Sequence, residues 1–353
     1  MKNICYFFIL SLVFAACKND APKNTLPSQD VVAANVDTTI NPSDDFFQFV
    51  HGRWFKNNPI PSSESSWGIG KVLQKDIYDK MRKVSEAAAA NTAAPKGSSQ
   101  QKIGDYWASG MDTAKIEAQG IEPIKEELAA IEGIKNIKDL LDVVAQMQNM
   151  GVAPLFSSFV YQDLKNSNQY SYYLFQGGLG LSERDYYFNT DSRNRAIREE
   201  YNKHLQNIFK LLGDTEGVAE KKAEAVFQLE VYLAKSHRKI EELRDQYKNY
   251  NKMSIADLQK LTPSVSWADM MAKTGVTTDS VVVGQPEFYK TVETSLTNFD
   301  IYEWKSYLKT QLIDGYAKFL NRKFEDEDFN FHGRVLEGKK EQKPRWKSVL
   351  DAQ

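Results

Sequence analysis

The chain has 353 residues, of which 42% are apolar and 26% are charged, and its 45 Lys and Arg residues nearly balance 47 Asp and Glu residues. This composition is typical of a folded globular protein and excludes a largely disordered chain. The net charge of −2 gives no support for nucleic acid as a partner. Because the length exceeds the usual size of one hydrophobic core, we expect two domains or one large domain with an accessory lobe.

The N-terminus has the pattern of an export signal. Lys2 precedes a mostly apolar run from Ile4 to Ala16, which is too short to cross a bilayer as a helix. The segment Phe14-Ala15-Ala16-Cys17 resembles the lipobox of bacterial lipoproteins, with Phe14 in place of the usual Leu. We therefore expect residues 1–16 to be a signal peptide and Cys17 to be lipidated, so that the exported protein is anchored to the periplasmic or surface face of the bacterial cell envelope. The alternative is a short amphipathic or buried N-terminal helix.

Residues 17–40 are rich in Asn, Asp, Pro, Ser and Thr, a composition that predicts a flexible tether between the lipid and a folded body at 41–353. A second break, from Ala87 to Gln101, is expected to end one helix and lead into the next. Cys5 and Cys17 are the only cysteines, so the folded body has no cysteine with which to form a disulfide or a metal site.

Helical periodicity dominates the folded body. Apolar residues recur at steps of three and four from Ile197 to Leu212, where Gly213 is the expected stop, and again from Ile301 to Phe319. Val226, Leu229 and Leu233 indicate a helix between these two. Residues 155–164 and 169–176 are rich in Phe, Tyr and Val and flank a polar turn, which predicts a β-hairpin. We therefore expect a mainly α fold, a multihelical lobe with a small β-hairpin.

The residue types that usually carry chemistry are sparse. The four histidines, His51, His204, His237 and His332, are never four residues apart, so the two-histidine zinc motif of a helix is missing. We interpret His204 as a histidine at the edge of the core and His51 as a cap at a helix end. We therefore predict no catalytic residue and no metal ligand in this chain, and we assign no substrate-binding residue.

Three further motifs have structural interpretations. Gly177-Gly178-Leu179-Gly180 is not a nucleotide loop, because Glu183 stands where a third glycine is needed. Ser182 and Asp185 fit a helix capping box. The carboxylate pair Asp44-Asp45 and the run Glu325–Asp328 are interpreted as solvated surface or helix starts.

Five segments in order along the chain carry a resemblance to a known family. Pro42 to Trp54, with Ile60-Pro61 and Trp67-Gly68 after it, is similar to the opening motif of the neprilysin family of zinc metallopeptidases, which includes endothelin-converting enzyme and bacterial oligopeptidases. The others are Tyr106–Asp112, Gly178–Leu181 with Arg184–Tyr187, Tyr250–Met253 and Pro344–Lys347. We interpret these residues as structural: Phe46, Phe49 and Trp54 anchor a short helix, Gly52 is its left-handed C-cap, and Arg184 pairs with Asp185.

The resemblance implies the N-terminal portion of a two-lobed, zincin-type peptidase, whose helical lobe restricts the central cavity to short peptides. In the family, the zinc-binding His-Glu-x-x-His helix and a third glutamate ligand come later in the chain. We therefore expect a truncated protein, a split gene or a fragment, with zinc and hydrolysis only in the complete enzyme and this chain inactive alone. One departure is Ser66, where the family commonly has an arginine that meets the terminal carboxylate of a peptide.

The missing catalytic lobe is the expected partner, and its absence should leave apolar surface exposed near Trp346, Val349 and Leu350. The rival hypothesis is a catalytically inactive, helical surface lipoprotein that binds peptides or glycans.

Overall fold

The computed structural model describes residues 31–353, so the predicted signal peptide, Cys17 and most of the tether lie outside the described residues. The chain forms two compact units, and the boundary between them falls between Pro59 and Ile60. Within the described residues, no helix combines the length and the apolar character that a membrane span requires.

The described part of the first unit, residues 31–59, contains two helices, α1 (Val31–Asn35) and α2 (Phe46–Asn57). Asp45 caps α2 by accepting a hydrogen bond from Gln48 N at 2.9 Å, which confirms that the Asp44-Asp45 pair marks a helix start. The backbone N–H of Asp37 donates to Phe49 O at 2.7 Å, so part of the predicted tether belongs to this folded unit.

The interpretation of His51 and Gly52 as the end of a helix is wrong. Helix α2 continues to Asn57, so His51 lies in the middle of the helix sequence, where its ring contacts that of Phe47 in a tilted arrangement with centroids 5.1 Å apart. Gly52 is buried, and a Cβ at that position would lie 2.9 Å from Cβ of Asp37. The glycine is therefore explained by the close approach of the segment that contains Asp37.

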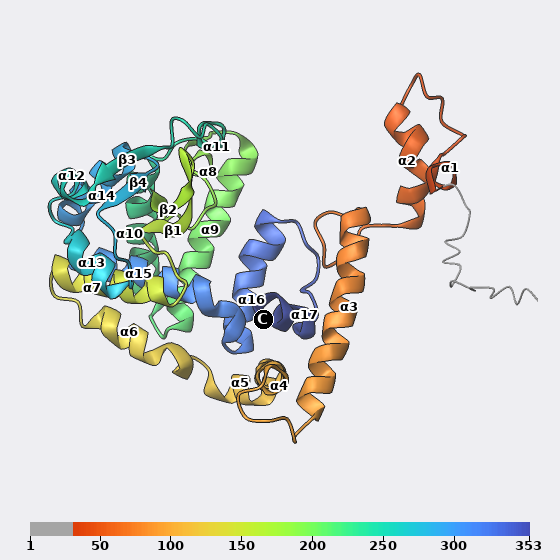
Figure 1. The fold of residues 1–353 in the computed structure, drawn as a ribbon, viewed down its shortest axis with the longest axis horizontal. Helices are drawn as coiled ribbons and strands as arrows, with labels where there is room; N and C mark the ends of the chain where they lie inside the picture. Colours follow the sequence, from red (N-terminus) through yellow and green to blue (C-terminus); the bar gives the residue numbers. More distant parts are fainter. Residues whose placement is uncertain (1–30) are drawn as a thin grey trace, which may run out of the picture. The chain divides into compact units, whose positions relative to one another are not determined.

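The second unit is mainly helical, as the sequence predicts (Figure 1). Its helices, including the short ones labelled η, are α3 (Ile69–Ala90), α4 (Ser99–Met111), α5 (Thr113–Gln119), η1 (Glu122–Ile124), α6 (Lys125–Glu132), α7 (Ile137–Asn149), α8 (Asp185–Phe188), α9 (Ser192–Leu211), α10 (Glu216–Ala234), α11 (Ile240–Leu243), α12 (Ile255–Leu261), α13 (Trp267–Lys273), α14 (Pro286–Asn298), α15 (Ile301–Tyr316), η2 (Ala317–Phe319), α16 (Arg322–Asp328), the π-helix η3 (Phe329–Leu336) and α17 (Arg345–Ala352). The break after Ala90 falls within the predicted range.

The predicted hairpin forms two strands of a four-stranded sheet. Its strands are β1 (Phe156–Asp163) and β2 (Asn166–Gln176), and they pair antiparallel. β4 (Ser280–Val283) pairs parallel to β2 and antiparallel to β3 (Asn251–Ser254), which gives the order β1-β2-β4-β3. Neither β3 nor β4 is predictable from the sequence, because each has four residues, too few to show an alternating pattern.

Helices α9, α10 and α15 form the centre of the main core. α10 packs against both of the others, and the predicted stripe residues Ile197, Leu229 and Leu308 are all buried. α9 ends before Gly213, whose φ of 98° is the left-handed conformation expected after a helix. Both long predicted helices are therefore confirmed. The capping box predicted at Ser182 and Asp185 is wrong, because α8 begins at Asp185 with Arg184 as its N-cap residue.

A second, smaller core joins α3, α4 and α17. Trp107, Val349 and Leu350 are buried there, so the prediction that apolar surface is exposed near Val349 and Leu350 is wrong. The close approach of α17 is possible because Gly110 has no side chain: a Cβ there would lie 2.8 Å from Val349 Cγ1. Pro344 is the N-cap residue of α17.

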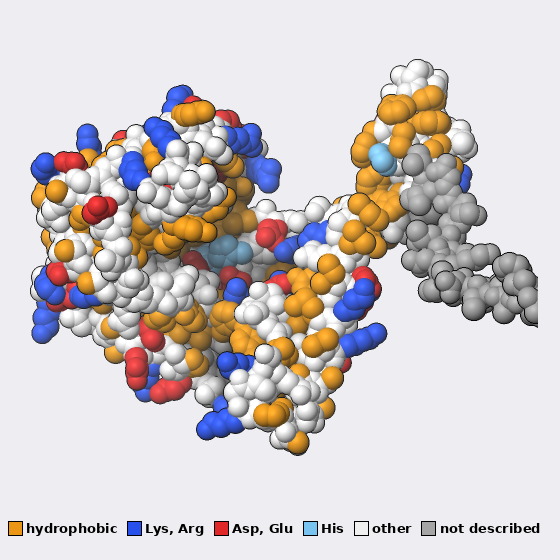
Figure 2. Space-filling view, in the orientation of Figure 1, with side chains coloured by type: hydrophobic (Ala, Val, Ile, Leu, Met, Phe, Trp, Pro, Cys, Tyr) orange, Lys and Arg blue, Asp and Glu red, His pale blue; other side chains and the backbone are white. Residues whose placement is uncertain are grey.

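Apolar residues are instead exposed along one side of α3 (Figure 2). Ile69, Leu73, Ile77 and Val84 are each more than half exposed, and Met81 is 39% exposed. Their spacing of three and four residues places them on one helix face. α3 therefore carries an apolar stripe, defined by these five residues, that the described residues leave largely uncovered.

Candidate functional site

The glycine-rich segment after β2 folds around a buried carboxyl group. The backbone N–H of Gly180 donates to Glu230 Oε1 at 3.2 Å, and the hydroxyls of Tyr187 and Tyr201 donate to the same carboxyl at 2.9 Å. Burial raises the pKa of Glu230 to about 8, against hydrogen bonds from Tyr201 and Tyr187 that lower it. The carboxyl is therefore largely protonated at neutral pH.

Close contacts explain two glycines of this segment. A Cβ on Gly180 would lie 1.9 Å from the hydroxyl oxygen of Tyr201, and Gly178 has a φ of 79°. The Tyr307 hydroxyl donates to Gly178 O at 2.5 Å. The segment is thus held by buried polar contacts from three helices, in agreement with its structural interpretation. Arg184 and Asp185 form the expected local ion pair at 3.5 Å.

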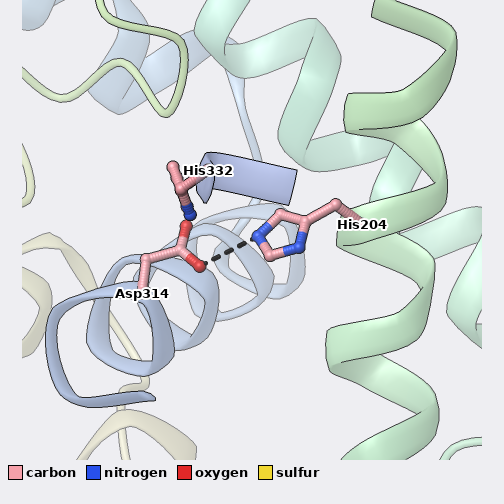
Figure 3. A group of neighbouring side chains, drawn as sticks. All are labelled: His204, Asp314 and His332. Atoms are coloured by element: carbon pink, nitrogen blue, oxygen red, sulfur yellow. Dashed lines mark hydrogen bonds and ion pairs between the residues drawn. The ribbon is translucent and has the colours of Figure 1, made fainter. Parts of the chain in front are cut away.

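A polar cluster lies near this network, where α9, α15 and η3 meet. His204 on α9 is 2% exposed, and its Nε2 lies 3.1 Å from Asp314 Oδ1 on α15. His332 comes from the π-helix η3, and its ring centroid is 5.3 Å from that of His204. One possible ligand atom from each of these three residues lies within 4.8 Å of those from the other two. Figure 3 shows the three side chains converging from three different elements.

Carboxylates also contact the outer nitrogens of both imidazoles. His204 Nδ1 lies 3.0 Å from Glu327 Oε1, and Asn207 Nδ2 donates to the other oxygen of Glu327 at 3.1 Å. His332 Nδ1 lies 3.0 Å from Asp328 Oδ1, at an angle that makes an ion-pair contact without a hydrogen bond. The orientations of both rings are therefore set by neighbouring charged groups.

The carboxylates also control the charge of the cluster. Burial disfavours the imidazolium form of His204, but Asp314 and Glu327 outweigh that effect and raise its pKa to about 9. Burial likewise opposes the charged form of His332, whereas Asp328 and Asp314 raise its pKa. Without a metal ion, His204 thus holds protons on both ring nitrogens at neutral pH and donates to two carboxylates.

Three residues of the cluster differ from the prediction or were not predicted. His204 is fully buried rather than at the edge of the core, and Glu327 does not belong to a solvated acidic surface, because its side chain is 15% exposed and contacts His204. Asp314 was not singled out. Two signals in the sequence could have found these residues: a histidine, His204, within the apolar stripe from Ile197 to Leu212, and an aspartate, Asp314, within the apolar stripe from Ile301 to Phe319.

The two remaining histidines take no part in this cluster. His51 lies on α2 in the first unit. His237 Nε2 donates to Gly177 O at 3.1 Å, and burial lowers the pKa of this side chain to about 4, so His237 is neutral. Ser66 is exposed in the segment before α3. The four histidines do not fit the catalytic zinc site of a zincin, because no two of them form the two-histidine helix motif.

The N-terminal model of peptidase family M13 matches residues 42–352. Among curated relatives, endothelin-converting enzyme 1 of Mus musculus is 28% identical over 327 residues, covering 89% of this chain and 42% of the relative. Neprilysin-3 of Drosophila melanogaster is 27% identical over 328 residues, covering 86% and 41%. The chain therefore spans less than half the length of the curated relatives that it matches here.

Solved structures are likewise similar to this chain over about half of their own length. Zinc metalloprotease Zmp1 of Mycobacterium tuberculosis, in complex with an inhibitor, superposes with a TM-score of 0.86 at 28% identity, covering 90% of this chain and 49% of that one. PepO from Lactobacillus rhamnosis HN001 has a TM-score of 0.75 at 18% identity, a likeness of fold alone. The predicted multihelical lobe with a small sheet is thus found in solved structures about twice as long.

Proposed function

Because the chain belongs to peptidase family M13, we propose that it is the N-terminal half of a zinc metallopeptidase that hydrolyses short peptides. In this proposal the helical lobe restricts access to the cavity in which cleavage occurs. The zinc ligands of that reaction lie outside this chain, and the chain alone is inactive. The observation that carries the proposal is the match of residues 42–352 to the N-terminal family model, at about half the length of the relatives.

The apolar stripe of α3 supports a partner lobe. Four of its five side chains are more than half exposed, and this arrangement is costly in water unless another surface covers it. A neighbouring face of α3, which includes Tyr78 and Ala89, already packs on α4 and α17. The stripe is therefore the surface that the catalytic half would cover.

The test is to mix this chain with a separately produced catalytic half and to measure cleavage of a short quenched fluorescent peptide. Zinc-dependent cleavage is expected only in the mixture. Ile77→Glu places a charge within the stripe and should weaken reassembly, raising the concentration of this chain needed for half-maximal activity. Lys83→Glu introduces the same residue at another exposed position of α3 and is the matched control.

Cleavage by this chain alone would contradict the proposal, because the active site would then lie within it. Failure of the mixture to cleave, combined with peptide or glycan capture by this chain alone, would favour the rival function of a surface binding lipoprotein. Equal loss of activity in the Ile77→Glu and Lys83→Glu variants would remove the role assigned to the α3 stripe.

We also propose that the chain is exported and lipid-anchored through Cys17. The support comes from the sequence alone: an apolar run follows Lys2, and Phe14-Ala15-Ala16-Cys17 resembles a lipobox. Anchoring would hold the enzyme at the bacterial cell envelope, where short peptides are its substrates.

A further inference from the structure

We propose that His204, Asp314 and His332 form a binding site for one zinc ion. This assignment departs from the sequence-based expectation that the chain contains no metal ligand. It is independent of the proposed peptidase function, because it concerns only residues of this chain and is tested without a catalytic half.

The separations of the three ligand atoms are close to those of a zinc site. Tetrahedral zinc with bonds of about 2.0–2.1 Å places its ligand atoms roughly 3.3 Å apart. His204 Nε2 and Asp314 Oδ1 already lie 3.1 Å apart, and all three possible ligand atoms lie within 4.8 Å. A small movement of His332 and Asp314 would therefore suffice. Zinc would take the place of the proton that His204 Nε2 donates to Asp314.

The neighbouring groups are those that commonly support a histidine ligand of zinc. In known zinc sites, the second ring nitrogen of such a histidine usually donates to a carboxylate, which fixes the tautomer and the ring orientation. Glu327 contacts His204 in this way, and Asn207 holds Glu327 in turn. Asp328 lies next to Nδ1 of His332. Phe331 also stacks on the His204 ring, with centroids 4.8 Å apart, which restricts its rotation.

A cavity at the surface is lined by one member of the cluster, His332. It has a volume of about 230 Å³, and its lining includes His332, Asp328 and Glu325. Figure 2 shows histidine atoms, in pale blue, visible from outside and next to acidic side chains. The cavity gives an ion access from the surface to His332, one of the three ligands.

The donor set favours zinc over calcium or magnesium. Two imidazole nitrogens and one carboxylate oxygen suit zinc and related transition metals, whereas the harder cations prefer oxygen ligands alone. His332 lies on a π-helix, and such segments frequently occur at functional sites. Zinc bound here would join α9, α15 and η3.

The test is titration of the purified, metal-free full chain with Zn²⁺ by isothermal calorimetry, with elemental analysis after removal of unbound metal. One zinc per chain is expected. His332→Gln and Asp314→Asn remove one ligand each at partly exposed positions and should weaken binding at least tenfold. Glu327→Gln, which changes a supporting group, should weaken it about 10–100-fold. His51→Gln is the control for adventitious binding at an exposed histidine.

Circular dichroism of every variant verifies that the fold is intact, and Co²⁺ provides a second readout through the visible absorption of the bound ion. Binding of zinc with loss in the His332 and Asp314 variants, but not in the His51 variant, supports the site. Absence of stoichiometric zinc, or binding that only the His51 variant removes, overturns it and leaves a proton-bridged ionic network in its place.

Discussion

The buried carboxyl group of Glu230 makes stability depend on pH in a direction opposite to that of most acidic residues. Its pKa is raised from 4.5 to about 8 in the folded chain, chiefly because burial disfavours the charged form. Between these two values, the folded state binds a proton that the unfolded state does not, so the free energy of unfolding falls as pH rises. The full effect corresponds to about 3–5 kcal/mol, at 1.36 kcal/mol for each pH unit.

Glu230→Gln should remove this dependence. The amide has nearly the size of the protonated carboxyl. Its oxygen can still accept from Gly180 N and the Tyr201 hydroxyl, while its NH₂ group, like the O–H of the protonated acid, donates to the hydroxyl oxygen of Tyr187. We expect the stability of the variant relative to the natural chain to increase by a few kcal/mol between pH 5 and pH 9. Urea unfolding followed by tryptophan fluorescence at several pH values measures this difference.

Glu220→Gln is the matched control, because Glu220 is exposed on the same helix, α10. Its stability relative to the natural chain should change little with pH. A Glu230→Gln variant whose stability difference stays constant from pH 5 to pH 9 would show that Glu230 ionises in the folded chain at its ordinary pKa. The argument from burial would then fail.

Three further changes test other parts of the description. Gly180→Ala should destabilise the fold by about 1–3 kcal/mol or more in thermal or urea unfolding, because the new methyl group would collide with the Tyr201 hydroxyl. Asp163→Asn should lower the free energy of unfolding by about 1–3 kcal/mol at pH 7, because the carboxylate binds Lys252 at 2.8 Å and Ser171 at 2.7 Å. These contacts hold the pKa of Asp163 well below its ordinary value, so the difference in stability between the variant and the natural chain should shrink only below about pH 4. Cys17→Ser should abolish labelling by a tagged fatty acid and release the protein from the membrane fraction, and undiminished labelling would refute the lipoprotein assignment.

Local signals predicted the long helices and the hairpin well. The stripe from Ile197 to Leu212 follows the helical period for several turns, and Gly213 supplies the stop at its end. The hairpin strands are long enough to show their β-forming composition. Short segments were harder, because β3 and β4 have four residues each and owe their conformation to pairing within the sheet.

The polar cluster could not be derived from spacing. His204 and His332 are distant in the sequence and come together only because η3 packs on α9. The run Glu325–Asp328 looked like solvated surface because acidic runs usually are, yet the fold turns Glu327 toward His204. A rule that requires two histidines on one helix detects sites with local ligand spacing, and it misses a site whose ligands come from three elements.

The α3 stripe shows a related limit of sequence reasoning. The apolar period in α3 and the one in α17 are equally good signals of a buried face, but only the latter is covered within this chain. Trp107 covers Val349 and Leu350, and Gly110 allows α17 to approach, so the end of the chain buries its own apolar side chains. The stripe from Ile69 to Val84 has no such cover among the described residues. The periodicity of a sequence shows that one face of a helix is apolar. Only the tertiary structure shows whether this lobe or a partner covers that face.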